Sequence, residues 1–404
     1  MDAPIDAAAK ANVTMSPDPS SPDARPEAVE PAPTRGQPPA AGRATPAFTP
    51  PAGWDRLPSA FGPPPASGRI RSTPEDFEVI EDLGFEPSDD GDYVILRVRK
   101  REANTQWVAR QIAQVADVPP KHINYAGQKD RYAVTEQSFS ILLPGGGDPD
   151  WSRLAAEPGI EVLDARRNRR MIRRGGLAGN AFTIVLRELA GPDGSPVDRQ
   201  AVEARLTALR ERGLPNYFGP QRFGHGGGNL PRALAVFEGR LRERDRFKRG
   251  MYISAARSWL FNRVLAARVE AGSWDAVLEG DAMMLEGSRS FFKATEVDAE
   301  IRRRTAEMDI HPTGPLWGRG APLVSGEALA LETAALAGCE AWQRGLESVG
   351  TKQERRALRL PVRDLSWDWP DATALRLAFS LAPGAYATTV LAELVTLEAS
   401  PADA

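Results

Sequence analysis

Cysteine and histidine are scarce in this chain of 404 residues, which has one cysteine and three histidines. The single cysteine, Cys339, excludes an intrachain disulfide and favours a reducing, cytoplasmic location. His122, His225 and His311 lie far apart and lack the spacing of metal ligands, so the sequence predicts no metal site. The chemistry of the protein must therefore be sought in other side chains.

Long apolar runs and a strong net charge are missing as well. No uninterrupted apolar run approaches the roughly 18 residues of a transmembrane helix, and the first residues lack the basic-then-apolar order of a secretory signal. We therefore expect no membrane association. The formal net charge of -3 argues against a protein that coats nucleic acid indiscriminately. For nucleic-acid recognition, local basic patches matter more than this total.

Large apolar residues are rare in the first 65 residues, which hold 16 of the 35 prolines. Such a segment cannot bury enough apolar surface to offset the entropy lost on ordering. We therefore expect residues 1–65 to form a disordered tail. Its seven acidic and five basic residues do not make a basic nucleic-acid-binding arm.

The pattern after Ile70 predicts an α+β fold. Alternating apolar residues predict strands, and longer stretches of helix-forming residues predict helices. Asn104 or Thr105 is placed to cap the first helix. Strands interrupted by unequal helices favour α+β over a repeating βαβ wind. The predicted strands lie around Phe77 and Val79 and over 93–98, 122–126, 137–143, 181–187 and 374–379, and the predicted helices lie over 105–116, 231–240, 254–271, 327–337 and 387–397.

The stretch from Ala126 to Gln137, with the sequence AGQKDRYAVTEQ, places one aspartate between two strands and among cations. A carboxylate at Asp130, flanked by Lys129 and Arg131, is kept ionised, as a nucleophile or base at neutral pH must be. The alternative interpretation is a hairpin turn with solvated charges.

A second string, PNYFGPQRFG at residues 215–224, places aromatics, glycines and an arginine where an ordinary core does not need them. Together, A-G-x-K-D-x-x-A-x-T-x-Q and N-Y-F-G-x-Q-R-F-G resemble the motifs of the TruD family of tRNA pseudouridine synthases. PEDFEVIE at 74–81 and GNAF at 179–182 are similar to two further segments of that family. The four elements follow the family's order between about Ile70 and Val395.

This resemblance implies a pseudouridine synthase catalytic domain with a mixed, largely antiparallel sheet and an inserted, mostly helical domain. The catalytic domain would be discontinuous, over residues 66–212 and 352–398, with the insertion over 213–351. It implies isomerisation of uridine to pseudouridine in tRNA, at position 13, with Asp130 as the catalytic aspartate. The reaction adds no group and changes no oxidation state, so we expect no cofactor. No protein partner is implied.

Three residues are candidates for the substrate pocket. Phe182 matches the aromatic residue of the N-x-F segment and could stack on the target base, although its spacing with Ile184 and Leu186 also fits a buried strand face. Asn180 could hydrogen-bond near the catalytic carboxylate or the base edge. Arg71 stands where the family carries lysine, and could serve as the counter-charge to Asp130.

Candidate RNA contacts come from clustered cations, because the arginine fork matches phosphate geometry. Arg222 is flanked by aromatics, which suits a phosphate or a splayed base. Lys129 should point away from Asp130, toward turn support or phosphate contact. A solvated surface face is the alternative for the arginine cluster and for a later run from Arg240 to Arg249. The cluster consists of Arg166, Arg167, Arg169 and Arg170, followed by Arg173 and Arg174.

Two other function classes stay open at this point. A non-catalytic RNA-binding or folding factor could use the same scaffold, because fold does not fix function. A nucleoside hydrolase could use the same carboxylate, and release of free uracil would distinguish it from an isomerase.

Overall fold

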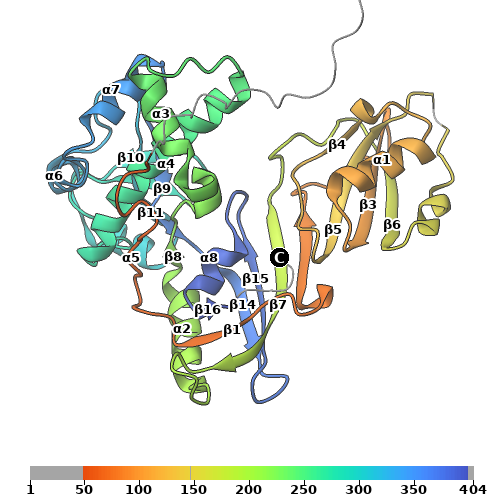
Figure 1. The fold of residues 1–404 in the computed structure, drawn as a ribbon, viewed down its shortest axis with the longest axis horizontal. Helices are drawn as coiled ribbons and strands as arrows, with labels where there is room; N and C mark the ends of the chain where they lie inside the picture. Colours follow the sequence, from red (N-terminus) through yellow and green to blue (C-terminus); the bar gives the residue numbers. More distant parts are fainter. Residues whose placement is uncertain (1–48, 146, 399–404) are drawn as a thin grey trace, which may run out of the picture. The chain divides into compact units, whose positions relative to one another are not determined.

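The computed structural model describes residues 49–145 and 147–398 and has the expected α+β fold, with some of its helices packed on a large mixed sheet (Figure 1). The helices are α1 (Thr105–Val115), α2 (Arg199–Arg212), α3 (Asn229–Phe237), α4 (Arg246–Glu270), α5 (Ala299–Ala306), α6 (Gly326–Ala335), α7 (Glu340–Ser348) and α8 (Ala387–Ala392). Short 3₁₀ turns lie at Pro74–Asp76, Pro120–His122, Trp151–Ala156, Pro220–Phe223 and His225–Gly227. No helix of the described segments is long and apolar enough to cross a membrane.

Ten strands of the described residues form the large sheet. Its main path runs β14-β15-β7-β2-β5-β3-β6, with β1, β16 and β4 attached beside it. Most neighbours pair antiparallel, whereas β2 with β5 and β1 with β16 pair parallel. The strands are β1 (Ala66–Arg69), β2 (Phe77–Asp82), β3 (Tyr93–Arg101), β4 (Ile123–Tyr125), β5 (Val134–Leu142), β6 (Ile160–Asn168), β7 (Gly179–Ala190), β14 (Arg363–Asp368), β15 (Leu375–Leu381) and β16 (Val395–Leu397).

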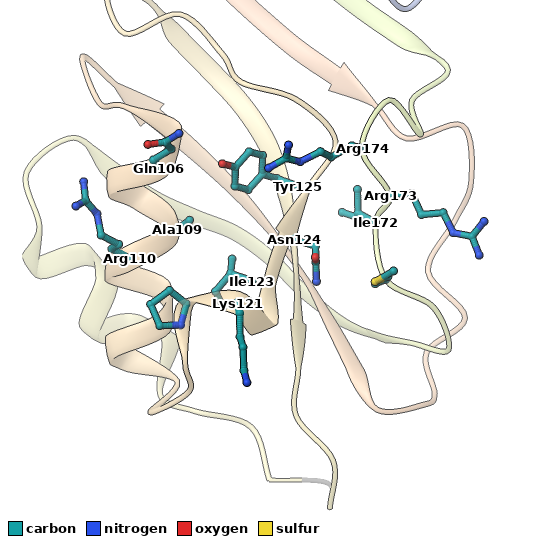
Figure 2. A pocket seen from close by; sticks show the side chains of 12 residues that line it. Gln106, Ala109, Arg110, Lys121, Ile123, Asn124, Tyr125, Ile172, Arg173 and Arg174 are labelled. Atoms are coloured by element: carbon teal, nitrogen blue, oxygen red, sulfur yellow. The ribbon is translucent and has the colours of Figure 1, made fainter. Parts of the chain in front are cut away.

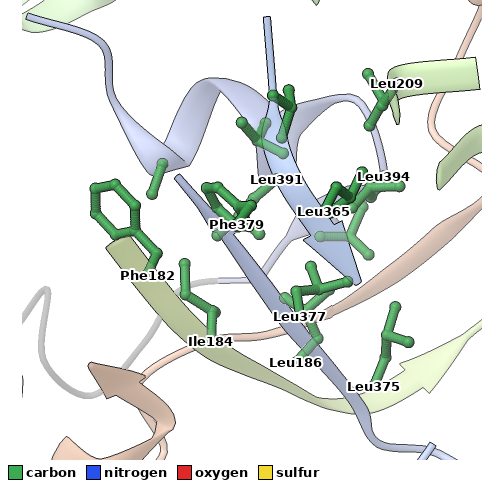
Figure 3. Packing of buried hydrophobic residues seen from close by; sticks show 14 of the residues in the cluster. Phe182, Ile184, Leu186, Leu209, Leu365, Leu375, Leu377, Phe379, Leu391 and Leu394 are labelled. Carbon is green, nitrogen blue, oxygen red and sulfur yellow. The ribbon is translucent and has the colours of Figure 1, made fainter. Parts of the chain in front are cut away.

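Two hydrophobic clusters pack against different parts of this sheet. In the first, α2 and α8 lie against β7, β14 and β15, and Figure 3 shows Phe182, Ile184 and Leu186 of β7 beside the apolar residues of β15. In the second, α1 lies against β3 and β5 (Figure 1), and Val108 and Ile112 of α1 belong to this cluster. The predicted alternation and the predicted Asn104 cap are both confirmed, since Asn104 accepts a hydrogen bond from Gln106 N.

A polar seam lies where the two clusters meet, along the pairing of β2 with β5. Residues 135–138 and Ser140 of β5 are all polar and buried. Glu81 of β2, Lys100 of β3 and Thr105 of α1 are buried near them. Buried polar groups must find partners, because an unpaired one costs the free energy of its lost hydration. The seam therefore fixes the side chains around it through hydrogen bonds, and the loop of Asp130 leads directly into β5.

Residues 214–357 form a separate small sheet and most of the helices. The four-stranded sheet has the order β10-β9-β11-β12, and β13 pairs with β8. Since β12 pairs with β11, the chain rejoins the large sheet only at β14, later than the predicted boundary at residue 352. The discontinuous domain division stays a prediction. The strands here are β8 (Leu214–Pro215), β9 (Ala282–Leu285), β10 (Phe291–Lys293), β11 (Ile310–Leu316), β12 (Glu354–Ala357) and β13 (Arg359–Leu360).

The disorder prediction is wrong for residues 49–65. Trp54 packs edge-on against Phe223, and Phe61 packs edge-on against Trp274, with ring centroids 5.5 and 5.9 Å apart. The Arg205 guanidinium donates to the Phe61 carbonyl oxygen at 2.6 Å. Two aromatics thus anchor a segment whose proline content suggested a tail. The rest of the predicted tail, residues 1–48, lies outside the described residues.

The closing helix is also shorter than predicted. Helix α8 ends at Ala392, and Val395–Leu397 form β16 instead of a last helical turn. This strand pairs parallel with Ala66–Gly68 of β1. A partner more than 300 residues away in sequence thus overrides the local helix pattern.

Candidate active site

Asp130 lies in the loop between β4 and β5, four residues before β5 begins. Its side chain is 36% exposed. The Lys100 ammonium is buried and fixes the main chain of the loop by donating to the Asp130 main-chain oxygen at 2.9 Å and to the Ala103 main-chain oxygen at 2.7 Å. Tyr132 N donates to Asp130 Oδ1 at 3.3 Å. The backbone of Asp130 is thus fixed while its carboxylate stays open to a substrate.

Arg71 pairs with this carboxylate, as Nη2 contacts Asp130 Oδ2. Its guanidinium carbon lies 4.5 Å above the centre of the Phe77 ring, and its side chain is only 16% exposed. Arg71 has a φ of 58°, in the left-handed region that non-glycine residues rarely adopt. Such conformations cost roughly 1–3 kcal/mol and occur preferentially at functional sites. The ion pair shows that the structure brings Asp130 together with Arg71, the counter-charge predicted for it.

Lys129 does not reach the surface as a phosphate ligand would. Its ammonium is 3.1 Å from Glu81 Oε1 and donates to Asn180 Oδ1, and its side chain is 8% exposed. Glu81 and Asn180 face each other across the pairing of β2 with β7. Burial raises the pKa of the Glu81 carboxyl, and the Lys129 ammonium opposes that rise. Lys129 thus connects the loop to β2 and β7, and Asn180 accepts one of the two contacts that make this connection.

Further hydrogen bonds connect the loop to helix α1 and to β5. Lys129 N donates to Thr105 Oγ1 at 3.0 Å, and that hydroxyl donates to Gln137 Oε1 at 3.0 Å. Gln137 Nε2 in turn donates to the Gly127 oxygen at 2.6 Å. Both ends of the loop are therefore held by the polar seam. The lysine and the glutamine of the motif, Lys129 and Gln137, are thus explained by the hydrogen bonds with which they hold the loop.

Phe182 lies in the first hydrophobic cluster and is 8% exposed. Its ring stacks on Phe379 with centroids 5.4 Å apart and meets Phe77 edge-on at 6.4 Å. Figure 3 shows it at one end of the packed row. Phe182 contacts Phe77, and the Arg71 guanidinium stacks on the other ring of that pair, Phe77. Phe182 therefore supports the position of Arg71 through Phe77. A role as base platform stays a prediction.

Three arginines of the predicted RNA-binding cluster are engaged by carboxylates. Arg166 pairs with Glu86 and Asp89, Arg167 with Asp148, and Arg169 with Asp90. Three guanidinium groups thus face four carboxylates. Because an RNA phosphate approaching them would also meet those acids, the structure favours the alternative of a solvated, self-neutralised face. Arg170 is exposed and has no side-chain partner among the described residues.

Arg222 is exposed and belongs to the sequence PNYFGPQRFG at residues 215–224, far from Asp130 in the chain. Its guanidinium carbon is 5.2 Å from the centre of the Phe218 ring, and Nη1 donates to Ser254 Oγ at 3.1 Å. Arg356 lies 4.2 Å from the same ring centre. Burial, and to a smaller extent the nearby Arg222 charge, lowers the pKa of Arg356 to about 10. Two arginines at one aromatic ring, with no carboxylate bonded to either among the described residues, suit a phosphate.

Sequence reasoning missed Lys100 and Glu81 as parts of the site. Burial lowers the pKa of the Lys100 ammonium to about 8, and the Asp130 charge acts in the opposite direction. Lys100 continues the buried face of Val94, Leu96 and Val98, and a cation at that position of the alternating strand was the available signal. Within the described ranges, no group of three or more histidine, cysteine or acidic residues could hold a metal ion.

Comparisons with known proteins agree with these features. The family model described as tRNA pseudouridine synthase D (TruD) matches residues 60–229 and 229–394. The chain is 53% identical over 347 residues to a tRNA pseudouridine synthase D of Methylococcus capsulatus, covering 86% of this chain and 96% of that protein. It is 46% identical over 339 residues to the protein of that name in Nitrosococcus oceani, covering 83% and 93%.

A solved structure from Methanosarcina mazei, described as a tRNA pseudouridine synthase D, has a similar fold. The TM-score is 0.66 at 22% identity, and the match covers 85% of this chain and 96% of that one. At this identity, the likeness concerns the fold alone.

Proposed function

Because the chain belongs to the TruD family of tRNA pseudouridine synthases, we propose that it converts a uridine of tRNA to pseudouridine, with Asp130 as the catalytic carboxylate. We include uridine 13 as the target and the cytoplasm as the location in this proposal. The observation that carries it is an accessible carboxylate on a rigid loop, paired with one cation and placed inside the family's motif.

The reaction itself explains why a held carboxylate is needed. The bond between uracil N1 and ribose C1′ breaks, the base turns, and C5 joins the same carbon, while C5 loses a proton and N1 gains one. Positive charge builds at the sugar when the first bond breaks. Asp130 can stabilise this charge, attack the sugar or base, or take the proton.

Arg71 and Lys100 prepare Asp130 for any of these roles. The Arg71 fork orients one carboxylate oxygen, and its stacking on Phe77 keeps the fork in place. Lys100 fixes the main chain without occupying the carboxylate. The target base must leave the RNA stack to reach this loop, and a closed pocket must keep the freed uracil from escaping. We propose Arg222 as a phosphate contact for the bound RNA.

The replacement Asp130→Asn tests the proposal, because it removes a charge and keeps the shape of the side chain. We expect the single-turnover rate of pseudouridine formation in tRNA to fall by about 10²- to 10⁴-fold or more, with tRNA affinity largely kept. Asp117→Asn, in an exposed turn after α1, is the matched control. Normal product from Asp130→Asn would refute the assignment.

Product analysis separates the other two function classes. Wild-type protein that binds tRNA and forms no pseudouridine would be a non-catalytic RNA-binding factor. Release of free uracil in amounts matching the modified uridine lost would indicate a hydrolase.

A further inference from the structure

A surface pocket of about 650 Å³ lies between helix α1, strand β4 and residues 171–174. This volume falls in the range of roughly 300–1000 Å³ that is typical of small-molecule sites, and it exceeds the needs of a bare phosphate. Figure 2 shows the side chains that surround it. We call it the α1–β4 pocket. None of the residues predicted for catalysis lines it.

Among the described residues, four cations line the α1–β4 pocket and no acidic residue does. These are Arg110 on α1, Lys121 before β4, and Arg173 and Arg174 before β7. All four are exposed, and within residues 49–145 and 147–398 none has a side-chain hydrogen bond or ion pair. Exposed cations that gather without counter-ions favour an anion, and a phosphodiester is the anion that an RNA-modifying enzyme meets.

The remaining lining suits a nucleobase. Tyr125 presents a half-buried ring, steadied by an edge-on contact with Phe139 at 5.8 Å between centroids. Met171, which is 44% exposed, also lines the pocket, and Gln106 and Asn124 supply amide groups. An aromatic ring stacks on an unpaired base, and amides can hydrogen-bond to its edges. Phosphate and base chemistry thus occur in one pocket.

The α1–β4 pocket is connected to the loop of Asp130. Gly175 N donates to the Ala126 oxygen at 2.7 Å, so the segment carrying Arg173 and Arg174 is bonded to the start of the loop. Tyr125 precedes Asp130 by five residues. Even a fully extended chain would therefore keep their Cα atoms within about 18 Å. An RNA strand with its target uridine at Asp130 can reach the pocket within a few nucleotides.

We propose that the α1–β4 pocket binds one unpaired nucleotide of the substrate RNA, close to the target uridine. The cations around the pocket hold its phosphodiester and those of the adjoining nucleotides, and Tyr125 stacks on its base. The proposal deepens the proposed function and rests on it for the identity of the ligand as RNA.

The double variant Arg173→Ala/Arg174→Ala tests the pocket, and Arg166→Ala/Arg169→Ala is its matched control. Both remove two arginines from one short stretch, but only the control arginines have carboxylate partners. We expect the pocket variant to weaken tRNA binding on the order of tenfold or more. The slope of log Kd against log salt should flatten by about 1.4. The control should change both quantities much less. Equal effects in the two variants, or none in the pocket variant, would overturn the proposal.

Chemical footprinting of the wild-type protein tests the same site without a substitution. Lys121 lines the pocket, whereas Lys293 is exposed on β10 and lies outside it. Bound tRNA should slow acetylation of Lys121 and leave Lys293 unchanged. If uridine monophosphate protects Lys121 and tRNA does not, the pocket is a small-molecule site and the proposal is wrong.

Failure of this proposal and failure of the proposed function give different results. A wild-type protein that forms no pseudouridine, but whose tRNA binding weakens in Arg173→Ala/Arg174→Ala, would refute the function and support the pocket. Normal pseudouridine formation with unchanged binding in that variant would refute the pocket alone.

Discussion

Two basic regions adjoin in the sequence and differ in what their charges contact. Arg166, Arg167 and Arg169 lie at the end of β6 and its continuation, and each is paired with at least one carboxylate. Arg173 and Arg174 follow within a few residues, and neither has an ion pair in the described structure. From the sequence the six-arginine run is a single patch. In the fold, Arg166, Arg167 and Arg169 form a neutralised face, Arg173 and Arg174 line the α1–β4 pocket, and Arg170 belongs to neither group.

The difference teaches that the partner of a cation decides its task. In these two regions, a carboxylate partner keeps the cation engaged within the protein, and a cation without such a partner stays open to an RNA phosphate. Lys129 and Lys100 extend the comparison to buried cations, of which one has a carboxylate partner and the other has main-chain carbonyl partners. Each class predicts a different response to substitution.

The largest effect should follow from Lys129→Met, which leaves the buried Glu81 without its cation. We expect the free energy of unfolding to fall by about 3–5 kcal/mol at neutral pH. The loss should shrink at acidic pH. Without the lysine, burial raises the pKa of Glu81 unopposed. A carboxyl group whose pKa is higher in the folded protein than in the unfolded chain destabilises the fold when the pH is above the unfolded pKa, and this destabilisation disappears as the pH falls below that value. Denaturant unfolding at several pH values measures this.

The double variant Lys129→Met/Glu81→Gln is the control for that prediction. It should recover much of the lost stability, because no buried charge remains. If Lys129→Met is as stable as wild type and binds tRNA with a flatter salt dependence, the lysine is an RNA contact and the comparison is wrong for it.

Lys100 should give a pH-dependent effect on rate. Its pKa of about 8 lies below the ordinary lysine value, so the folded protein loses this proton while the unfolded chain keeps it. Its contribution to stability therefore rises with pH between about 8 and 10.5. The single-turnover rate should fall across pH 8, as the charge behind Asp130 disappears. In Lys100→Met the single-turnover rate below pH 8 should be lower than that of the wild type, on the order of tenfold, and the fall in rate across pH 8 should be absent.

Removing acids should convert the neutralised face into a binding face. In Asp89→Asn/Asp90→Asn, the guanidinium groups of Arg166 and Arg169 lose carboxylate partners. We expect tRNA affinity to rise several-fold, with a slope of log Kd against log salt that is steeper by up to about 1.4. Titration with tRNA across a salt series measures both. Unchanged affinity would mean that this face does not adjoin the bound RNA at all.

The smallest effect compares two neighbours. Arg169 is paired with Asp90, and Arg170 has no side-chain partner among the described residues. Arg170→Ala should lower tRNA affinity a few-fold and flatten the salt slope by about 0.7–0.9, whereas Arg169→Ala should leave both nearly unchanged. The reverse order would show that a carboxylate partner does not remove an arginine from RNA binding.

Local patterns were sufficient for the elements whose residues carry their own signal. The alternation of Phe182, Ile184 and Leu186 predicts β7, and Asn104 predicts the start of α1. The resemblance placed Asp130 and Arg71 in one site, and they form an ion pair. These features depend on neighbours in sequence or on a known family pattern.

Features that depend on distant partners could not be predicted. Strand β16 needs β1 to replace a helical continuation. Residues 49–65 are ordered by Trp54 and Phe61, whose contacts lie more than 150 residues away. The carboxylates that neutralise Arg166 and Arg169 come from residues 86–90, in the loop that leads into β3, the strand that pairs with β6. Charge counts along the chain contain no information about such pairings.

The polar seam makes catalytic competence more fragile than the fold. The apolar clusters on its two sides attract by contact area, which tolerates small displacements, but the hydrogen bonds from Lys100, Thr105 and Gln137 weaken steeply with distance and angle. A slight parting of the two halves would release the loop while both clusters stayed packed. In a urea titration, activity should therefore disappear at lower concentrations than helical circular dichroism, so that the enzyme is silenced before it unfolds.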